Sequence, residues 1–597
     1  MIRYVKNILY ILGEDKSKLP FLVILFLLSS LVEVLGVAVV GPYIALAFGP
    51  SMSDNELLLT IIQWLNLSVK HESFLTLLGL MLIIVFMMKM VLSTWVNYRI
   101  IYFTQNQNVI LREKLMHTYQ SMAYVDYIQR NSSDYINSIH SLVAGYSSNV
   151  LTGVLKFLSE SIVVIAILLI LLWTNWLVLF LLILLLIPVM LFYDYFFGFR
   201  LKGYGVVANQ SNIAMVKNIT QGIEGAKELR VLANQGFFLD KVVHNAKSLR
   251  DSESKRQLIS MFPRFLLELL LIIFVVLVVV VMSEMGGGRE YMLSTLGVFG
   301  VASMRLLPAI SSLTGSVAMI RFGGDTVDRM YGDIKLSNSY DKNVSYDHAF
   351  QKYRNRDVFE KILLKNISFI YPNSKNKSLN NMSLRIMSGE CIGFIGHSGA
   401  GKTTIVDLLL GLLQPTSGTI EYNGRRCESL ASTWQKQVAY LPQQVFLIDA
   451  SVRNNIALGV PDHEIDSNRI EESIKQASLG EVIKQLADGV NTEIGERGVR
   501  LSGGQRQRVA LARAFYHKRR ILVMDEATSA LDSKTEQEIV NEINQLKGKM
   551  TMIVIAHRLS TLQHCDRVYK LEKGRIIDTG MIDSNLIFHS NGKKAYG

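Results

Sequence analysis

Long apolar runs separated by polar stretches occupy the first half of the chain, from about residue 19 to about residue 320. A helix needs about 20 mostly apolar residues to cross the hydrocarbon core of a bilayer. Six segments are predicted to be transmembrane helices: 19–47, 74–96, 150–173, 176–197, 265–282 and 293–320. The sixth contains Arg305 and Pro308, but its small and apolar residues continue far enough to span the bilayer.

The two long polar stretches, residues 97–148 and 200–261, have apolar residues at helical spacing, so they are predicted to be helices that continue beyond the membrane. They carry many basic residues: Arg99, Arg112, Lys114, Arg200, Lys202, Lys217, Lys227 and Arg230. Basic loops stay on the cytoplasmic side. We therefore expect a multi-pass integral protein of the cell (inner or plasma) membrane, with both termini in the cytoplasm.

The second half, after about residue 330, alternates apolar and polar positions like a soluble α/β domain. The predicted organisation is a transmembrane domain over 1–332, a polar linker over 333–357 and a second domain over 358–597. The net charge of +12 is explained by basic cytoplasmic loops, which argues against a nucleic acid partner. The three cysteines, Cys391, Cys427 and Cys565, do not have metal-ligand spacing.

A glycine-rich loop lies between a predicted strand, 390–395, and a predicted helix that starts at Thr403. Glycines let the backbone curl around phosphates, whose charge the N–H groups and the helix N-terminus stabilise. Lys402 is expected to contact the β- and γ-phosphates, and Thr403 to supply a hydroxyl to Mg²⁺. The expected nucleotide contacts in this loop are Gly396, His397, Ser398, Gly399, Ala400, Gly401, Lys402, Thr403 and Thr404.

A second strand, 521–524, ends in Asp525 and Glu526. An acidic pair at the end of a buried strand suits a metal–phosphate site, and Asp525 is expected to hold Mg²⁺. Between the loop and this strand lies Leu501-Ser502-Gly503-Gly504-Gln505. The order of the three motifs resembles the ATP-binding cassette (ABC) ATPases, whose Walker A, signature and Walker B motifs they match.

The resemblance implies roles for further residues. Glu526 is implied as the catalytic glutamate that polarises water, and His557 as the switch histidine at the γ-phosphate. Gln443 is implied as the glutamine that senses Mg²⁺, and Tyr371 as the aromatic residue that stacks on adenine. Four residues are implied to cap the ATP held by a second cassette: Ser502, Gly503, Gly504 and Gln505. The implied cofactors are ATP and Mg²⁺, and the implied partner is a second copy of the chain.

The whole pattern resembles an ABC exporter half-transporter of the type IV fold. This implies an α-helical six-span transmembrane domain, with an elbow helix and two long intracellular loops, followed by an α/β P-loop nucleotide-binding domain. Residues 492–498 match a segment found before the signature motif in exporters. The complete set of catalytic motifs favours a homodimer. The loop tips near 124–130 and 234–238 are implied to be coupling helices that dock on the cassettes, one of them on the partner's.

Three cations lie within or at the edges of the predicted transmembrane helices: Lys89, Arg264 and Arg305. Each charge at mid-membrane costs about 2.5–3.5 kcal/mol on insertion scales. One interpretation is that Glu33 and Glu268 neutralise some of them, or that Lys89 and Arg264 reach the membrane surface. The other is that the cations bind an anionic substrate.

Residues 33–44 and 305–310 look like the bacterial flippases that turn over lipid-linked oligosaccharides. Residues 53–67 add a predicted external helix in the outer interface, or a packing element. The resemblance implies ATP-driven flipping of an amphiphilic anionic substrate, such as a polyprenyl-pyrophosphate-linked oligosaccharide. Two alternatives remain open: an exporter of peptides, drugs or ordinary lipids, and an ATP-gated channel or regulator.

Overall fold

The computed structural model describes residues 2–48, 71–174, 176–284, 289–343, 359–427, 434–527, 533–556, 559–582 and 588–590. The chain divides into two compact units. The first unit comprises Met1–Met122 and Arg130–Asn343, and the second comprises Ala123–Gln129 and Val344–Gly597. The external helix expected at 53–67 lies outside the described residues.

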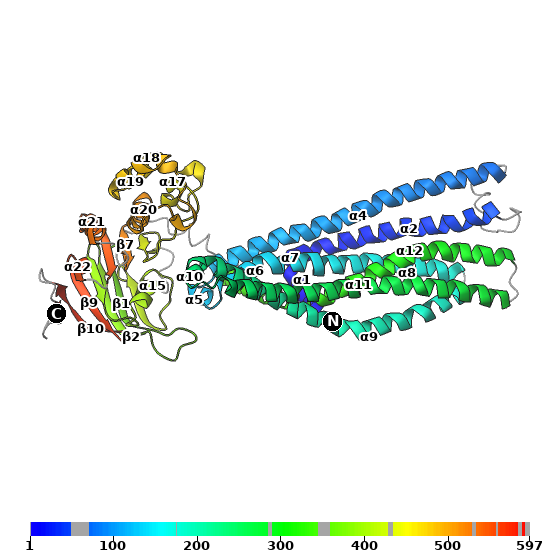
Figure 1. Cartoon of the computed structure of the whole chain (residues 1–597), viewed down its shortest axis with the longest axis horizontal. Coiled ribbons are helices and arrows are strands. Elements are labelled where there is room, and N and C mark those ends of the chain that lie inside the picture. The colour runs from blue at the N-terminus through cyan, green and yellow to red at the C-terminus, as the bar shows by residue number, and fades with distance from the viewer. Residues whose placement is uncertain are drawn as a thin grey trace. The chain divides into compact units, whose positions relative to one another are not determined.

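Long helices build the first unit (Figure 1). They are α1 (Ile2–Leu12), α2 (Leu19–Phe48), α4 (His71–Ser121), α8 (Thr152–Thr174), α9 (Trp176–Glu224), α11 (Gly236–Glu284), α12 (Arg289–Phe322) and α13 (Gly324–Asn343), with the shorter α6 (Ser132–Asn137), α7 (Val143–Gly145) and α10 (Ala226–Val231). Six helical segments of the described chain are long and apolar enough to cross a membrane. Each contains part of one predicted span, so the six-span prediction is confirmed.

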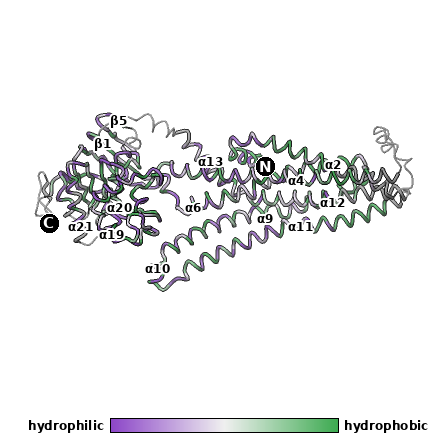
Figure 2. Tube along the Cα trace, turned by 90° about the horizontal axis from the view of Figure 1, so that it is seen from above, coloured by the Kyte–Doolittle hydropathy of each residue, from purple (hydrophilic) through white to green (hydrophobic). Residues whose placement is uncertain are grey.

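Three of these helices are much longer than a membrane span. Helix α4 has 51 residues, and α9 and α11 have 49 each. At 1.5 Å per residue such helices extend roughly 75 Å, against about 30 Å for the hydrocarbon core. Helices α9 and α11 run side by side to the turn that contains α10 (Figure 2). The polar stretches are therefore continuations of the transmembrane helices, as their periodicity predicts.

Helix α13 alters the expected linker. Asp333 was the expected start of a polar linker, but α13 continues to Asn343 and Asp333 is buried. Its Oδ1 accepts a hydrogen bond from Arg130, 2.8 Å away, and its Oδ2 accepts from Ser138 at 3.0 Å and Tyr119 at 3.1 Å. This carboxylate, with both oxygens hydrogen-bonded, ties α13 to α4 and to the start of the next helical run.

Two sheets form the second unit. The smaller has the order β2-β1-β4-β5, and the larger has the order β11-β10-β9-β3-β8-β7-β6. The strands are β1 (Lys361–Phe369), β2 (Leu379–Met387), β3 (Cys391–Ile395), β4 (Ser417–Tyr422), β5 (Arg425–Cys427), β6 (Val438–Leu441), β7 (Ile521–Asp525), β8 (Thr551–Ile555), β9 (Arg567–Glu572), β10 (Arg575–Ile582) and β11 (Phe588–Ser590). Strands β9, β3, β8, β7 and β6 are parallel neighbours.

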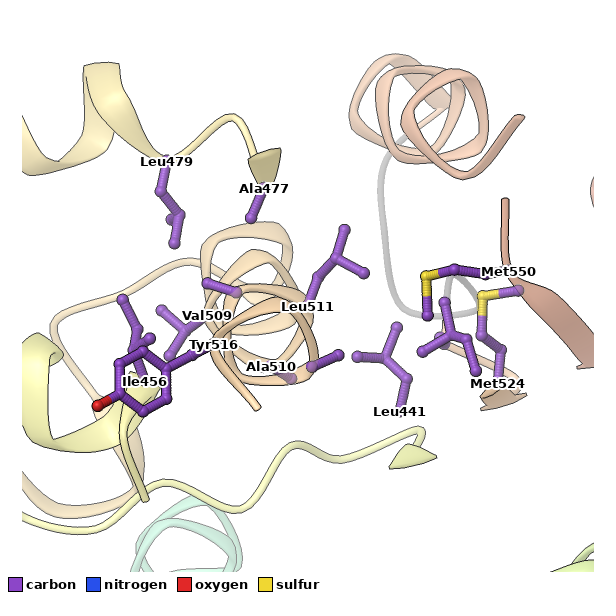
Figure 3. Packing of buried hydrophobic residues seen from close by; sticks show 14 of the residues in the cluster. Leu441, Ile456, Ala477, Leu479, Val509, Ala510, Leu511, Tyr516, Met524 and Met550 are labelled. Atoms are coloured by element: carbon purple, nitrogen blue, oxygen red, sulfur yellow. The ribbon is translucent and has the colours of Figure 1, made fainter. Parts of the chain in front are cut away.

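The helices of the second unit are α5 (Tyr124–Tyr127), α15 (Lys402–Leu409), α17 (Val452–Ile456), α18 (Ser467–Gln476), α19 (Gly480–Gln485), α20 (Gly503–Tyr516), α21 (Ser533–Asn544) and α22 (Leu559–Leu562). Helix α20 is central to one hydrophobic core (Figure 3). Its apolar residues pack toward Ile456 and Leu479 on one side and toward Met524 and Met550 on the other. This burial fixes the N-terminus of α20, which carries the signature motif.

Candidate functional site

Five parallel strands of the described chain end at one edge of the larger sheet, and predicted site residues follow four of them, β3, β6, β7 and β8. In the register of the sheet, Phe394 of β3 pairs with Ile555 of β8, and Ile555 pairs with Asp525 of β7. Leu441 of β6 pairs with Met524. Ligands of open α/β sheets bind at such carboxyl edges. The fold therefore brings together the glycine-rich loop, Asp525, Glu526 and the segment that contains Gln443.

The glycine-rich loop between β3 and α15 requires glycine at two positions. Gly396 has φ +156°, and a Cβ there would lie 2.5 Å from the carbonyl oxygen of Leu571. Gly401 has φ +102°, and a Cβ there would lie 2.7 Å from the carbonyl oxygen of Ser378. No side chain fits either place, so the loop can pack closely against its neighbours and keep its backbone N–H groups for phosphates.

Lys402 is buried at the start of α15, with its ammonium group turned into the loop. Its Nζ donates to the carbonyl oxygens of Gly396, 2.7 Å away, and His397, 3.3 Å away. These bonds hold the cation at the centre of the loop. ATP phosphates are stronger acceptors than neutral carbonyls and would take over this ammonium group.

Carboxylates gather opposite this lysine. Burial raises the pKa of Asp525, and the adjacent Glu526 raises it further, while a hydrogen bond from Tyr440 and the charge of Lys402 act against this. The Tyr440 hydroxyl lies 3.3 Å from Oδ2 of Asp525. Burial, together with the charge of Asp525, raises the pKa of Asp407 in α15 to about 6. The site therefore holds more negative charge than it can easily stabilise alone.

A divalent cation fits this excess charge. Within the part of the chain that the structure describes, no three His, Cys, Asp or Glu side chains form a closed metal cage. Mg²⁺ is usually bound by one or two carboxylates plus substrate phosphates. Asp525 and the exposed Thr403 at the start of α15 match that requirement, so the metal would be held jointly with the nucleotide.

Glu526 has an unusual backbone for its residue type. Its φ is +51°, in the left-handed region that costs energy for residues other than glycine. Its N–H donates to the carbonyl oxygen of Ile555 at 3.0 Å, which ties the ends of β7 and β8 together. Its Oε2 lies 3.5 Å from Nε2 of Gln443. The structure thus places two predicted catalytic residues side by side, in a conformation fixed by the sheet.

Tyr371 lies beside the glycine-rich loop, and the signature motif begins helix α20. The Tyr371 ring packs edge-on against Phe369, and its hydroxyl is 3.5 Å from Oγ1 of Thr404 beside the glycine-rich loop. Ser502 caps α20 and forms a reciprocal capping box with Gln505. Ser502 and Gly503 are exposed, so the N-terminus of a 14-residue helix is open to an anion. His557 lies outside the described residues.

The transmembrane unit brings two of its three predicted cations together. Oε1 of Glu33 lies 2.6 Å from Nε of Arg305 and 3.3 Å from Nζ of Lys89. Arg305 also lies 3.5 Å from Glu160. Arg264 instead pairs with Glu268 on its own helix at 3.1 Å, and both side chains are exposed. Neutralisation by Glu33 and Glu268 therefore occurs, and Arg264 does not share the charged group of the other two.

Sequence reasoning missed Asp407, Tyr440 and Glu160. Tyr440 lies in the strand before Gln443, but no motif marks it, because its contact with Asp525 depends on the pairing of β6 with β7. Glu160 could have been found as a carboxylate inside the apolar run 150–173. Nothing local marks Asp407, because its effect on Asp525 depends on the packing of α15 against the sheet.

Comparison with known proteins adds the family. A model of the ABC transporter transmembrane region matches residues 19–307, and an ABC transporter model matches residues 379–529. A protein of Cupriavidus metallidurans named ATP-dependent lipid A-core flippase is 28% identical over 489 residues, covering 80% of each chain. A protein of the same name from Pseudoalteromonas translucida is 42% identical over 222 residues, covering 37% of this chain and 38% of that one.

One solved structure has the same fold over nearly the whole chain. A bacterial Atm1-family ABC exporter with ATP bound superposes with a TM-score of 0.74 over 96% of both chains. The sequence identity is 20%, so this similarity supports the fold alone. It agrees with the predicted architecture of six spans and one α/β nucleotide-binding domain.

Proposed function

Because this chain belongs to the ABC transporters, with the membrane-spanning region and the ATP-binding domain of a transport ATPase, we propose that two copies form a homodimer that flips an anionic amphiphile across the membrane. The finer proposal is that the cargo is a polyprenyl-pyrophosphate-linked oligosaccharide. The main observation in favour of an anionic substrate is the position of Arg305, whose guanidinium group lies within the apolar helix α12.

The ATP site supports hydrolysis by a division of roles. Lys402 and the loop N–H groups bind the phosphates, and Tyr371 lies beside the loop to stack on adenine. Thr403 and Asp525 would hold Mg²⁺, which would supply positive charge to the phosphate oxygens. Glu526 polarises the attacking water, with Gln443 next to it, and His557 contacts the γ-phosphate. Ser502, Gly503, Gly504 and Gln505 of each chain close the site of the partner.

The membrane half supports a phosphate-bearing lipid. Guanidinium groups stay charged and bind phosphate oxygens in pairs, so Arg305 suits a pyrophosphate better than a neutral cargo. The names of the relatives, ATP-dependent lipid A-core flippases, favour an anionic glycolipid as the class of substrate. The resemblance of residues 33–44 and 305–310 to flippases of lipid-linked oligosaccharides narrows that class.

The test is an inward-to-outward flipping assay with the full-length protein in liposomes that contain defined lipid-linked glycans. We expect ATP-dependent movement of a pyrophosphate-linked glycolipid and no movement of its neutral polyprenol analogue. ATP-dependent transport of peptides or drugs with no glycolipid movement would support the general exporter instead. If ATP allows substrate to pass only down its concentration gradient, the result would support an ATP-gated channel.

A further inference from the structure

Four charged side chains from four different helices meet inside the transmembrane unit. They are Glu33 of α2, Lys89 of α4, Glu160 of α8 and Arg305 of α12, and we call them the membrane ion cluster. Glu33 is 4% exposed, and Glu160, Lys89 and Arg305 are each about a quarter exposed or less. Two carboxylates and two cations balance within the membrane ion cluster, and Lys156, four residues before Glu160 on α8, adds a further positive charge that acts on Glu160.

Charge balance explains why these residues can be accommodated. Isolated charged side chains within the hydrocarbon core of a bilayer are costly. Pairing removes much of that cost, but removing one partner leaves an uncompensated buried charge, which is strongly destabilising. Any ligand that takes a cation from the membrane ion cluster must therefore bring its own negative charge.

The hydrogen bonding of the membrane ion cluster is incomplete. Both cations approach the same oxygen, Oε1 of Glu33. Oε2 of Glu33, Oε2 of Glu160 and Nε of Arg305 are buried and form no hydrogen bond, although Oε2 of Glu160 lies 3.5 Å from Nη2 of Arg305 as an ion pair. The contrast is Asp333, where both carboxylate oxygens accept hydrogen bonds from three donors. A fully satisfied network fixes a structure, whereas a partly satisfied one is weaker and easier to exchange.

We propose that Glu33 occupies the anion site of the transporter: its carboxylate neutralises Arg305 and Lys89 until a phosphate-bearing lipid head group takes these cations from it. The inference rests on the proposed function and adds how the site is filled and emptied. A pyrophosphate carries more charge than one carboxylate and can engage a guanidinium through two oxygens. Glu33 then competes with the bound head group, which limits affinity and favours release on the far side.

The test measures ATPase stimulation by a lipid titration. The full-length protein is placed in nanodiscs of phosphatidylcholine, and polyprenyl pyrophosphate is added, with the neutral polyprenol as the uncharged probe. Glu33→Gln keeps the shape of the side chain and removes the competing charge. We expect the half-maximal pyrophosphate-lipid concentration to fall about tenfold, which corresponds to ~1.4 kcal/mol. The polyprenol response should not change.

Two controls make the result specific. Glu268→Gln also removes a carboxylate paired with an arginine in a transmembrane helix, but outside the membrane ion cluster, and should leave the midpoint unchanged. If Glu33→Gln alone does not fold, Glu33→Gln/Lys89→Gln restores charge balance, and it is compared with Lys89→Gln because Lys89 itself belongs to the proposed site. Relative to Lys89→Gln, the double variant frees Arg305 from Glu33, so its midpoint should be lower. Inorganic pyrophosphate at constant free Mg²⁺ separates a free anion from a lipid head group, and we expect no stimulation by it.

An unchanged or higher midpoint in Glu33→Gln, with wild-type protein that responds to the pyrophosphate lipid, would overturn this inference and leave the proposed function intact. Stimulation of the wild-type protein by inorganic pyrophosphate as strong as by the lipid would overturn the assignment to a lipid head group. A wild-type protein that responds to neither pyrophosphate lipid nor any other anionic lipid would overturn the proposed function and this inference together.

Discussion

At the scale of single residues, we expect Glu526 to act in ATP hydrolysis and not in nucleotide binding. Glu526→Gln keeps the side-chain shape, and the N–H bond to Ile555 that holds its backbone is unaffected. We expect ATP to bind normally and turnover to fall about 10²–10⁴-fold, the usual contribution of a general base. Lys402→Ala should instead weaken ATP binding, because the loop loses its cation. Equilibrium binding and steady-state ATPase assays distinguish the two, and near wild-type turnover of Glu526→Gln would contradict its role.

Tyr440 affects the protonation of Asp525, the carboxylate that we propose to hold Mg²⁺. Burial and the nearby carboxylates raise the pKa of Tyr440, so its hydroxyl stays protonated and can donate to Asp525. That hydrogen bond lowers the pKa of Asp525. Tyr440→Phe should therefore leave Asp525 more protonated at low pH and raise the Mg²⁺ concentration needed for half-maximal ATPase a few-fold, more at pH 6 than at pH 8. Tyr569→Phe, which loses a hydroxyl bonded to the Arg385 carbonyl, is the matched control.

Asp407 makes stability depend on pH. Its pKa is raised from 3.8 to about 6, mainly by burial. Between these values the folded state binds more protons than the unfolded state, so stability falls as pH rises through this window and stays lower above it. Without nucleotide, Asp407→Asn should gain thermal stability over the wild type as pH rises from 4.5 to 6.5, with a constant gap above that. If the difference in thermal stability between Asp407→Asn and the wild type is as large at pH 4.5 as at pH 6.5, burial of the Asp407 charge is not its cause.

At the scale of elements, the sequence predicts what depends on local patterns. Apolar length identifies the six spans, and the glycine spacing identifies the loop before α15, because each is a property of consecutive residues. Partners distant in sequence are not visible in this way. Asp333 is polar like a linker residue, yet it is buried in α13, where its carboxylate accepts hydrogen bonds from three donors. Glu160 becomes part of the charged group only through its contact with Arg305 on another helix. The periodicity of either helix does not specify that contact.

The loop tips offer an element-scale prediction. Helix α5 belongs to the same compact unit as the nucleotide-binding domain, and Val125 packs against a hydrophobic core of that domain. At the C-terminal end of α10, Val231 and Leu232 are 80% and 72% exposed. Exposed apolar residues at a loop tip favour docking on another surface. We expect α5 to dock within its own chain and α10 to dock on the partner's cassette.

Cysteine cross-linking measures this difference. Cysteines placed at Val125 and at Leu232, each combined with one near Gln443 after replacement of the native cysteines, should behave differently on a denaturing gel. The first pair should cross-link within one chain, and the second should give a covalent dimer. A covalent dimer from the first pair, or none from the second in an active protein, would contradict the exchange of α10 between chains.

At the scale of the whole molecule, the exposed N-terminus of α20 predicts that each ATP site is built from two chains. Ser502→Ala in both chains should greatly reduce hydrolysis and leave ATP affinity near normal, with a small cost of about 1 kcal/mol for the lost helix cap.

The sharper test combines Lys402→Ala in one chain with Ser502→Ala in the other, using two affinity tags to purify the mixed dimer. If the sites are shared, both defects fall in one site, and the other joins an intact loop to an intact signature motif. The mixed dimer should then hydrolyse ATP well above either homodimeric variant, approaching half of the wild-type rate if the sites act independently. If each chain completed its own site, both sites of the mixed dimer would be damaged and its activity would be no higher than that of the two parents.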